Sequence, residues 1–168
     1  GTILVQNLEG GDGTYKYLLA SDQEVLSGVV SIMGKEYPWV KIGSQYWMAA
    51  DLAYTDGEDD IIAGQPQFGG MYYTHDAAVR IAGQIEGWRL PTLEETALLS
   101  EFAGGDLSAG AKLKGLTLWN APNTDASNQF DFNALPAGEI LSDGHSGIGS
   151  EYYFWTENTI TSNDETLA

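Results

Sequence analysis

Hydrophobic and polar residues alternate most clearly between residues 37 and 48. Positions 37–42 alternate, Gly43 and Ser44 follow as a turn, and positions 45–48 continue with aromatic and apolar residues. Aromatic and β-branched residues favour strands, and a short turn between two such runs favours a hairpin. The pattern therefore predicts a compact β-hairpin over this stretch.

The first 34 residues have a different character. Short β-prone runs at 3–5 and 15–19 flank a glycine-rich turn at 9–13, and a further apolar stretch covers 25–33. Such runs, divided by glycine, indicate a hairpin or a connector. We therefore expect residues 1–34 to be a β connector, or the end of an upstream region.

A first helix is expected over residues 74–84. Thr74 is a suitable N-cap, because its hydroxyl can accept a hydrogen bond from a free N–H of the first turn. Apolar residues recur at helical spacing, which predicts one buried face. That face comprises Ala77, Ala78, Ile81 and Ala82.

A second helix should begin after Pro91. Thr92 and Glu95 have the spacing of a capping box, in which each side chain bonds the other residue's N–H, and the glycine pair at 104–105 should end the helix. A short helical turn over 109–114 is expected to follow. The buried stripe of the second helix is predicted to comprise Leu98, Leu99 and Phe102.

The remaining segments predict loops and short strands. Residues 55–70 form a polar loop, and 119–131 an extended loop rich in Asn, Asp, Thr and Ser. Short strands are expected at 130–136 and 151–156, separated by a glycine-rich loop at 142–150. The whole pattern indicates an α+β domain over 35–158, with a polar tail at 159–168.

Charge narrows the range of partners. The chain carries a formal net charge of -17 at pH 7 and no cysteine. Such a surface repels phosphate backbones and anionic lipid, and no stretch approaches the roughly 20 apolar residues of a membrane span. We therefore expect neither nucleic-acid binding nor membrane insertion. The charge suits neutral glycans, basic partners or divalent cations, or simply keeps the protein soluble.

Several motifs, in a fixed order, carry a family resemblance. The most distinctive is GWRLPT at 87–92, with Glu95 three positions later. The other blocks are KIGSQYWMA at 41–49, DLAY at 51–54, AKLK at 111–114, WN at 119–120, FNALPAG at 132–138 and YFWTE at 153–157. Together they resemble the Fibrobacter succinogenes major paralogous domain family.

The resemblance implies a C-type-lectin-like α+β fold. In such folds two helices pack on small antiparallel sheets, and long irregular loops present the binding surface. Similar domains belong to secreted or surface proteins of Bacteroidetes and Fibrobacter, and related ones occur on phage virions. This chain departs from the pattern at Gln84, where relatives often carry cysteine. It also lacks an apolar strand after residue 157, so either the chain is truncated or another segment supplies that strand.

The sequence contains no recognisable catalytic motif. Without cysteine, thiol nucleophiles are excluded. His75 and His145 lie in no metal or triad motif, and Glu94 and Glu95 are explained by helix capping and the helix dipole. We therefore expect that the protein is not an enzyme. Arg89, inside the central motif, is expected to act as a structural clamp through its planar fork of donors, with ligand recognition as the alternative.

A candidate calcium site lies in the polar loop. Calcium takes six to eight oxygen ligands from carboxylates, amides and carbonyls, and Asp125, Asn128 and Asp131 are the candidate metal ligands. Asn and Asp also populate turns, because their side chains bond nearby backbone. The sequence leaves both interpretations open: a structural calcium ion, or turn chemistry alone.

The aromatic residues separate into core and surface candidates. We expect the tryptophans inside motif strands or at a helix entry to be core. In each pair of neighbouring tyrosines, at 72–73 and at 152–153, one ring should pack and one should be exposed, because neighbours on a strand face opposite ways. The predicted core tryptophans are Trp39, Trp47, Trp88 and Trp155.

Trp119 leads into the polar loop, beside planar amides that suit sugar hydroxyls, and is the preferred candidate for a ligand-binding aromatic. Core packing of Trp119 is the alternative. The predicted ligand-binding residues are Trp119, Asn120, Asn123, Asp125 and Tyr152.

The sequence thus favours a non-catalytic recognition module on a bacterial surface or secreted protein, binding glycan or protein. The alternative is a structural or receptor-binding part of a phage virion fibre, which would form a homo-oligomer through its N-terminal strands. Location follows the same division: extracellular or cell-surface in the first case, virion in the second.

Overall fold

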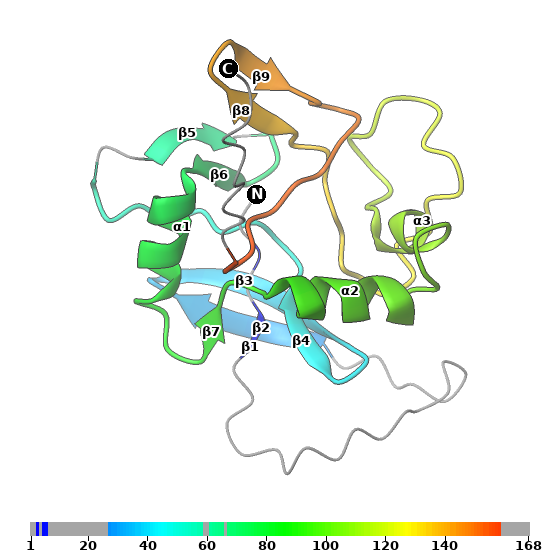
Figure 1. Ribbon diagram of the computed structural model, residues 1–168, viewed down its shortest axis with the longest axis horizontal. Coiled ribbons are helices and arrows are strands. Elements are labelled where there is room, and N and C mark those ends of the chain that lie inside the picture. Colours follow the sequence, from blue (N-terminus) through cyan, green and yellow to red (C-terminus); the bar gives the residue numbers. More distant parts are fainter. Residues whose placement is uncertain (1–2, 4, 7–26, 59–60, 66, 159–168) are drawn as a thin grey trace, which may run out of the picture.

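The computed structural model describes residues 3, 5–6, 27–58, 61–65 and 67–158. This part of the chain forms three helices, one five-stranded sheet and two hairpin sheets (Figure 1). The predicted α+β class is therefore confirmed. The described residues contain no helix long and apolar enough to cross a membrane.

The five-stranded sheet has the order β2-β3-β4-β1-β7, and its neighbouring strands are antiparallel. The predicted hairpin is confirmed as β3 with β4, in which Val40 lies opposite Trp47. The five strands are β1 (Val5–Gln6), β2 (Ser27–Ile32), β3 (Lys35–Ile42), β4 (Gln45–Met48) and β7 (Trp88–Arg89).

Part of the predicted N-terminal connector contributes to this sheet. Strand β2 pairs with β3 from Ser27 to Ile32, and β1 lies between β4 and β7. The boundary drawn between residues 34 and 35 thus falls in the turn of a hairpin. The second run of the predicted N-terminal hairpin, at 15–19, lies outside the described residues.

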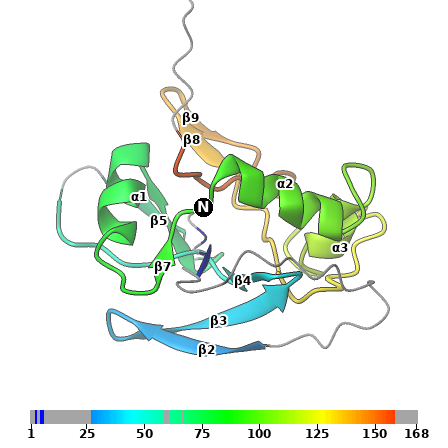
Figure 2. The same cartoon turned by 60° about the horizontal axis from the view of Figure 1, so that its bottom comes forward.

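Two of the helices begin where their caps predicted. Helix α1 (His75–Ala82) starts after Thr74, whose hydroxyl accepts from the Ala77 N–H. Helix α2 (Leu93–Phe102) carries the complete capping box, and α3 (Ala109–Leu113) confirms the expected helical turn over 109–114. In Figure 2 the three helices lie on the same side of the main sheet, whose strands β2 and β3 run along the bottom of the view.

The predicted buried stripe of α2 is wrong at one position. Leu98 is 46% exposed, whereas Leu99 is buried and Phe102 is partly buried. Residues three and four apart share a helix face, so Leu98 and Leu99 lie on the two sides of Phe102. The core covers the side of Leu99, and Leu98 lies on the exposed side.

The two small sheets correct the predicted loops and strands. Strand β5 (Ile61–Gln65) lies inside the expected polar loop and pairs with β6 (Gly70–Tyr73), which begins at the last residue of that loop. Strand β8 (Glu139–Leu141) pairs with β9 (Gly144–Ser146) within or beside the expected glycine-rich loop. The runs predicted as strands at 130–136 and 151–156 instead make isolated bridges. In the first run Phe130, Phe132 and Ala134 are buried, whereas in the second run partly buried and exposed side chains alternate.

The core is centred on Trp47, which is fully buried. Its ring lies edge-on to Phe132 and Phe154, at 6.0 and 6.4 Å between centroids. The prediction for the first tyrosine pair is wrong, because Tyr72 and Tyr73 are both buried. Both faces of β6 are covered, and each hydroxyl reaches a backbone carbonyl: Tyr72 that of Ala137, and Tyr73 those of Leu52 and Tyr54.

Candidate binding surface on the C-terminal strap

The last described segment, residues 151–158, forms what we call the strap. It runs from the β8–β9 hairpin to the N-terminus of α2, as the orange-to-red trace in Figure 1 shows. Exposure alternates along it: positions 152, 154 and 156 are partly buried, and 151, 153, 155 and 157 are exposed. This period of two is typical of an extended segment with one covered face.

The first anchor of the strap is Tyr152. Its hydroxyl donates to Asp51 Oδ1 at 2.8 Å, and burial raises the pKa of both groups. A small hollow adjoins this pair, with room for about 30 Å³, which suits one or two water molecules but not a sugar ring. The hollow is lined by Ala50, Asp51, Phe68, Phe132, Asn133, Leu135 and Tyr152.

The middle of the strap is held by β6 and α1. The indole N–H of Trp155 donates to the Tyr73 carbonyl at 2.8 Å, and its ring meets the His75 ring edge-on at 5.3 Å between centroids. His75 Nε2 lies 3.0 Å from the Thr156 carbonyl. These contacts fix the orientation of the indole ring.

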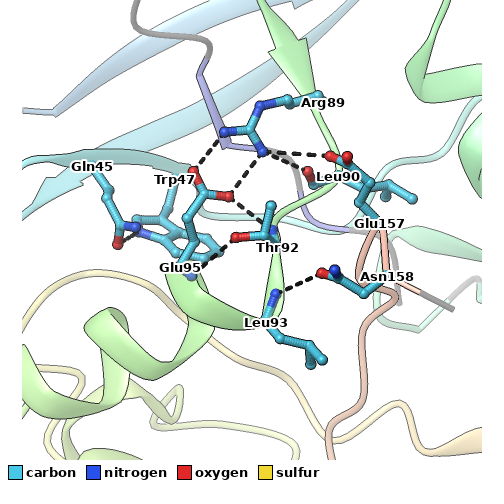
Figure 3. A network of polar contacts seen from close by, with 9 residues as sticks. All are labelled: Gln45, Trp47, Arg89, Leu90, Thr92, Leu93, Glu95, Glu157 and Asn158. Carbon is cyan, nitrogen blue, oxygen red and sulfur yellow. Dashed lines mark hydrogen bonds and ion pairs between the residues drawn. The ribbon is translucent and has the colours of Figure 1, made fainter. Parts of the chain in front are cut away.

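The far end of the strap meets α2 and β7 (Figure 3). The Glu157 N–H donates to the Pro91 carbonyl at 2.8 Å, and Glu157 Oε2 lies 3.9 Å from Arg89 Nη1. Asn158 Oδ1 accepts from the Leu93 N–H at 2.9 Å. That N–H is one of the free donors at the start of a helix, so the strap helps to cap α2.

Arg89 joins β7 to the helix cap. Its guanidinium binds Glu95 through two hydrogen bonds, of 2.6 and 2.9 Å, and donates to the Leu90 carbonyl at 3.0 Å. Burial raises the pKa of Glu95, but the hydrogen bonds from Arg89 and Thr92 outweigh burial and leave the pKa lowered. The predicted structural role of Arg89 is confirmed.

Two aromatic side chains project from the outer face of the strap. Tyr153 is 42% and Trp155 41% exposed. The expectation that Trp155 is core is wrong. Its N–H bonds the Tyr73 carbonyl and its ring contacts His75, but its side chain is on the exposed face of the strap. Of the second tyrosine pair, Tyr152 packs and Tyr153 is exposed, as predicted.

Sequence reasoning selected Tyr152 for binding and missed Tyr153 and Trp155. The local signal was the alternation itself, because the outward positions 151 and 157 are glutamates. The path of the strap, which decides which set faces solvent, depends on contacts with Asp51, Tyr73 and Arg89, far away in the sequence.

The predicted loop residues make contacts within their own region. Trp119 is partly buried, donates to the Ala134 carbonyl at 3.1 Å, and has Lys114 Nζ 4.7 Å from a ring centroid. Asn120 is exposed, and its N–H bonds the Gly149 carbonyl. The Asn123 amide donates to the Gly115 carbonyl, which precedes the loop, at 3.2 Å. Trp119, Asn120 and Asn123 thus bond three different partners, Ala134, Gly149 and Gly115, and Tyr152 lies on the strap.

The three candidate calcium ligands lie at turn positions. Asp125, Asn128 and Asp131 have left-handed φ angles of 57°, 46° and 54°, a conformation that Asn and Asp tolerate well. Asn128 Oδ1 accepts from the Asn133 N–H at 2.9 Å, and its carbonyl accepts from Asp131. Across the part of the chain that the structure describes, no three His, Cys, Asp or Glu side chains gather as metal ligands. These contacts favour turn chemistry, and calcium here stays a prediction.

The fold is thus a mixed α+β scaffold with a clamped strap and irregular loops. The chain belongs to the Fibrobacter succinogenes major domain family, whose model matches residues 40–167. Neither a curated protein nor a solved structure gives a significant match. The family assignment from the motifs is confirmed, and the C-type-lectin-like arrangement stays a prediction.

Proposed function

We propose that the domain is a non-catalytic recognition module of a surface or secreted protein, and that it binds protein or glycan through the strap. The observation that carries the proposal is the pair Tyr153 and Trp155, each about two-fifths exposed on a segment with anchors along its length. Aromatic side chains supply large contact areas, and a segment ordered before binding loses less entropy on association.

The contacts of the titratable groups support a structural role for them. His75 is engaged by the Thr156 carbonyl, and His145 packs against Tyr72 at 5.3 Å between ring centroids. The buried carboxyl of Asp51 accepts the Tyr152 hydroxyl. Each group is thereby explained by packing or anchoring, which fits a binding module better than an acid–base catalyst.

A glycan array, probed with and without a chelator, tests the proposal. We expect any bound glycan to be lost in Trp155→Ala, because that change removes one of the two exposed rings, and to be retained in Asn120→Ala. Binding that survives Trp155→Ala would move the site to another surface. Hydrolysis of a bound glycan would contradict the non-catalytic part of the proposal.

A further inference from the structure

The outer face of the strap combines two rings with carboxylates, and we call it the ridge. Tyr153 and Trp155 are two positions apart, which in an extended segment places their side chains on one face about 7 Å apart. The ridge is defined by Glu151, Tyr153, Trp155 and Glu157, all exposed.

Each ring has acidic neighbours. The Tyr153 hydroxyl bonds Glu151, which raises its pKa, and Glu139 lies close enough to raise it further. Trp155 also has acidic neighbours. Glu157, two positions further along the strap, has a side chain that is 58% exposed. The His75 ring packs on Trp155, and the side chain of the next residue, Asp76, is 99% exposed. The nearby Arg89 is bound by Glu95. The ridge is therefore a negative surface within an acidic protein.

Resting on the proposed function, we propose that the ridge binds an arginine-containing segment of a partner protein. A guanidinium is planar and weakly hydrated, so it stacks on an aromatic face while its donors reach a carboxylate. On the ridge each aromatic residue has a glutamate two positions away: Glu151 for Tyr153, and Glu157 for Trp155. A neutral glycan would bring no positive charge to the acidic ridge, and an acidic segment would be repelled.

Titration of the full chain with oligo-arginine and with oligo-lysine of equal length tests this inference. Both peptides carry the same charge, so attraction to the acidic surface alone binds them equally. Lysine can also lie over an aromatic ring, but only the planar guanidinium stacks on it while reaching a carboxylate, so oligo-arginine should bind about two- to five-fold more tightly. Isothermal titration calorimetry measures both affinities.

Variants make the result specific to the ridge. The arginine preference should be lost in Trp155→Ala and reduced in Tyr153→Ala. Trp155→Phe should keep part of it, since the ring stays although the indole N–H bond to Tyr73 is gone. Leu107→Ala is the matched control, because this fully exposed apolar side chain lies off the ridge, between α2 and α3.

Equal affinities for the two peptides, or an arginine preference that survives Trp155→Ala, would overturn the inference. Ridge-dependent binding of a neutral glycan without any arginine preference would also overturn it, yet leave the proposed function intact. Self-association that disappears in Trp155→Ala would mean that a second copy of the chain covers the ridge, which equally excludes the arginine segment.

Discussion

The strap and the polar loop at 119–131 both combine aromatic and polar residues, yet they use them in opposite ways. In the loop, polar side chains such as Asn123 and Asn128 bond carbonyls and N–H groups close by, and Trp119 is tied down by Ala134. In the strap, the Tyr152 hydroxyl and the Trp155 indole N–H bond distant elements, while the side chains of Tyr153 and Trp155 stay about two-fifths exposed.

The difference shows why polar composition is a weak guide to a binding surface. The side chains of Asn and Asp in a loop often form hydrogen bonds with the backbone of the loop's own turns. A binding surface is made of side chains that remain exposed to solvent in the folded chain. By that criterion the ridge is the better candidate, although the loop has the richer polar chemistry.

The largest stability difference should separate the two faces of the strap. Tyr152→Phe removes the donor to Asp51 and leaves a buried carboxyl without its partner, which we expect to cost about 1–3 kcal/mol in the free energy of unfolding. Tyr153→Phe, one residue away and exposed, should cost less than about 0.5 kcal/mol. Urea denaturation of both variants measures this, and equal losses would show that the strap has no distinct inner face.

The buried carboxyl of Asp51 should also make the free energy of unfolding depend on pH. Burial raises the pKa of Asp51 above its ordinary value of 3.8, so the folded chain keeps a proton that the unfolded chain loses. Relative to Asp51→Asn, the wild-type protein should therefore lose stability as pH rises above about 4, by at most about 1.4 kcal/mol per pH unit. Parallel stability profiles of the two proteins would rule out a buried, neutral Asp51.

The clamp at the far end should have a smaller effect. Arg89→Lys loses the bidentate bond to Glu95 at a partly exposed site, and we expect a cost of about 1 kcal/mol. Hydrogen exchange should quicken in the strap and in the first turn of α2. Arg80→Lys is the control, because Arg80 binds Asp56, a residue outside the strap, with similar side-chain exposure. Hydrogen exchange in the strap that rises equally in this control would contradict the role of Arg89.

The smallest effect is expected in the loop. Asp125 has a left-handed φ of 57°, which glycine adopts without strain, so Asp125→Gly should change stability by less than about 0.5 kcal/mol. The turn interpretation also predicts the same melting temperature with and without a chelator. A chelator-dependent drop in the wild type that vanishes in Asp125→Gly would instead establish the calcium site.

The features that could be predicted from sequence are those set by neighbours along the chain. The β3–β4 hairpin follows from alternation around Gly43, and both long helices follow from the caps at Thr74 and Thr92. The role of Arg89 was accessible because its partner Glu95 belongs to the same motif.

The features that could not be predicted depend on distant contacts. Strand β5 lies among acidic residues that resemble a loop, and it forms because β6 pairs with it. Trp155 looks like a core residue, and its exposure follows from where Tyr73 and His75 hold its indole ring. Local patterns therefore predicted much of the scaffold, but they did not predict the ridge.

The most direct test compares the strap with the loop in one binding measurement. Wild-type protein, Trp155→Ala and Asn120→Ala are applied at equal concentration to one array of glycans and arginine-containing peptides, after their melting curves show that each is folded. We predict that signals of the wild type persist in Asn120→Ala and disappear in Trp155→Ala. Loss of binding in Asn120→Ala, with binding retained in Trp155→Ala, would contradict the account and return the site to the loop.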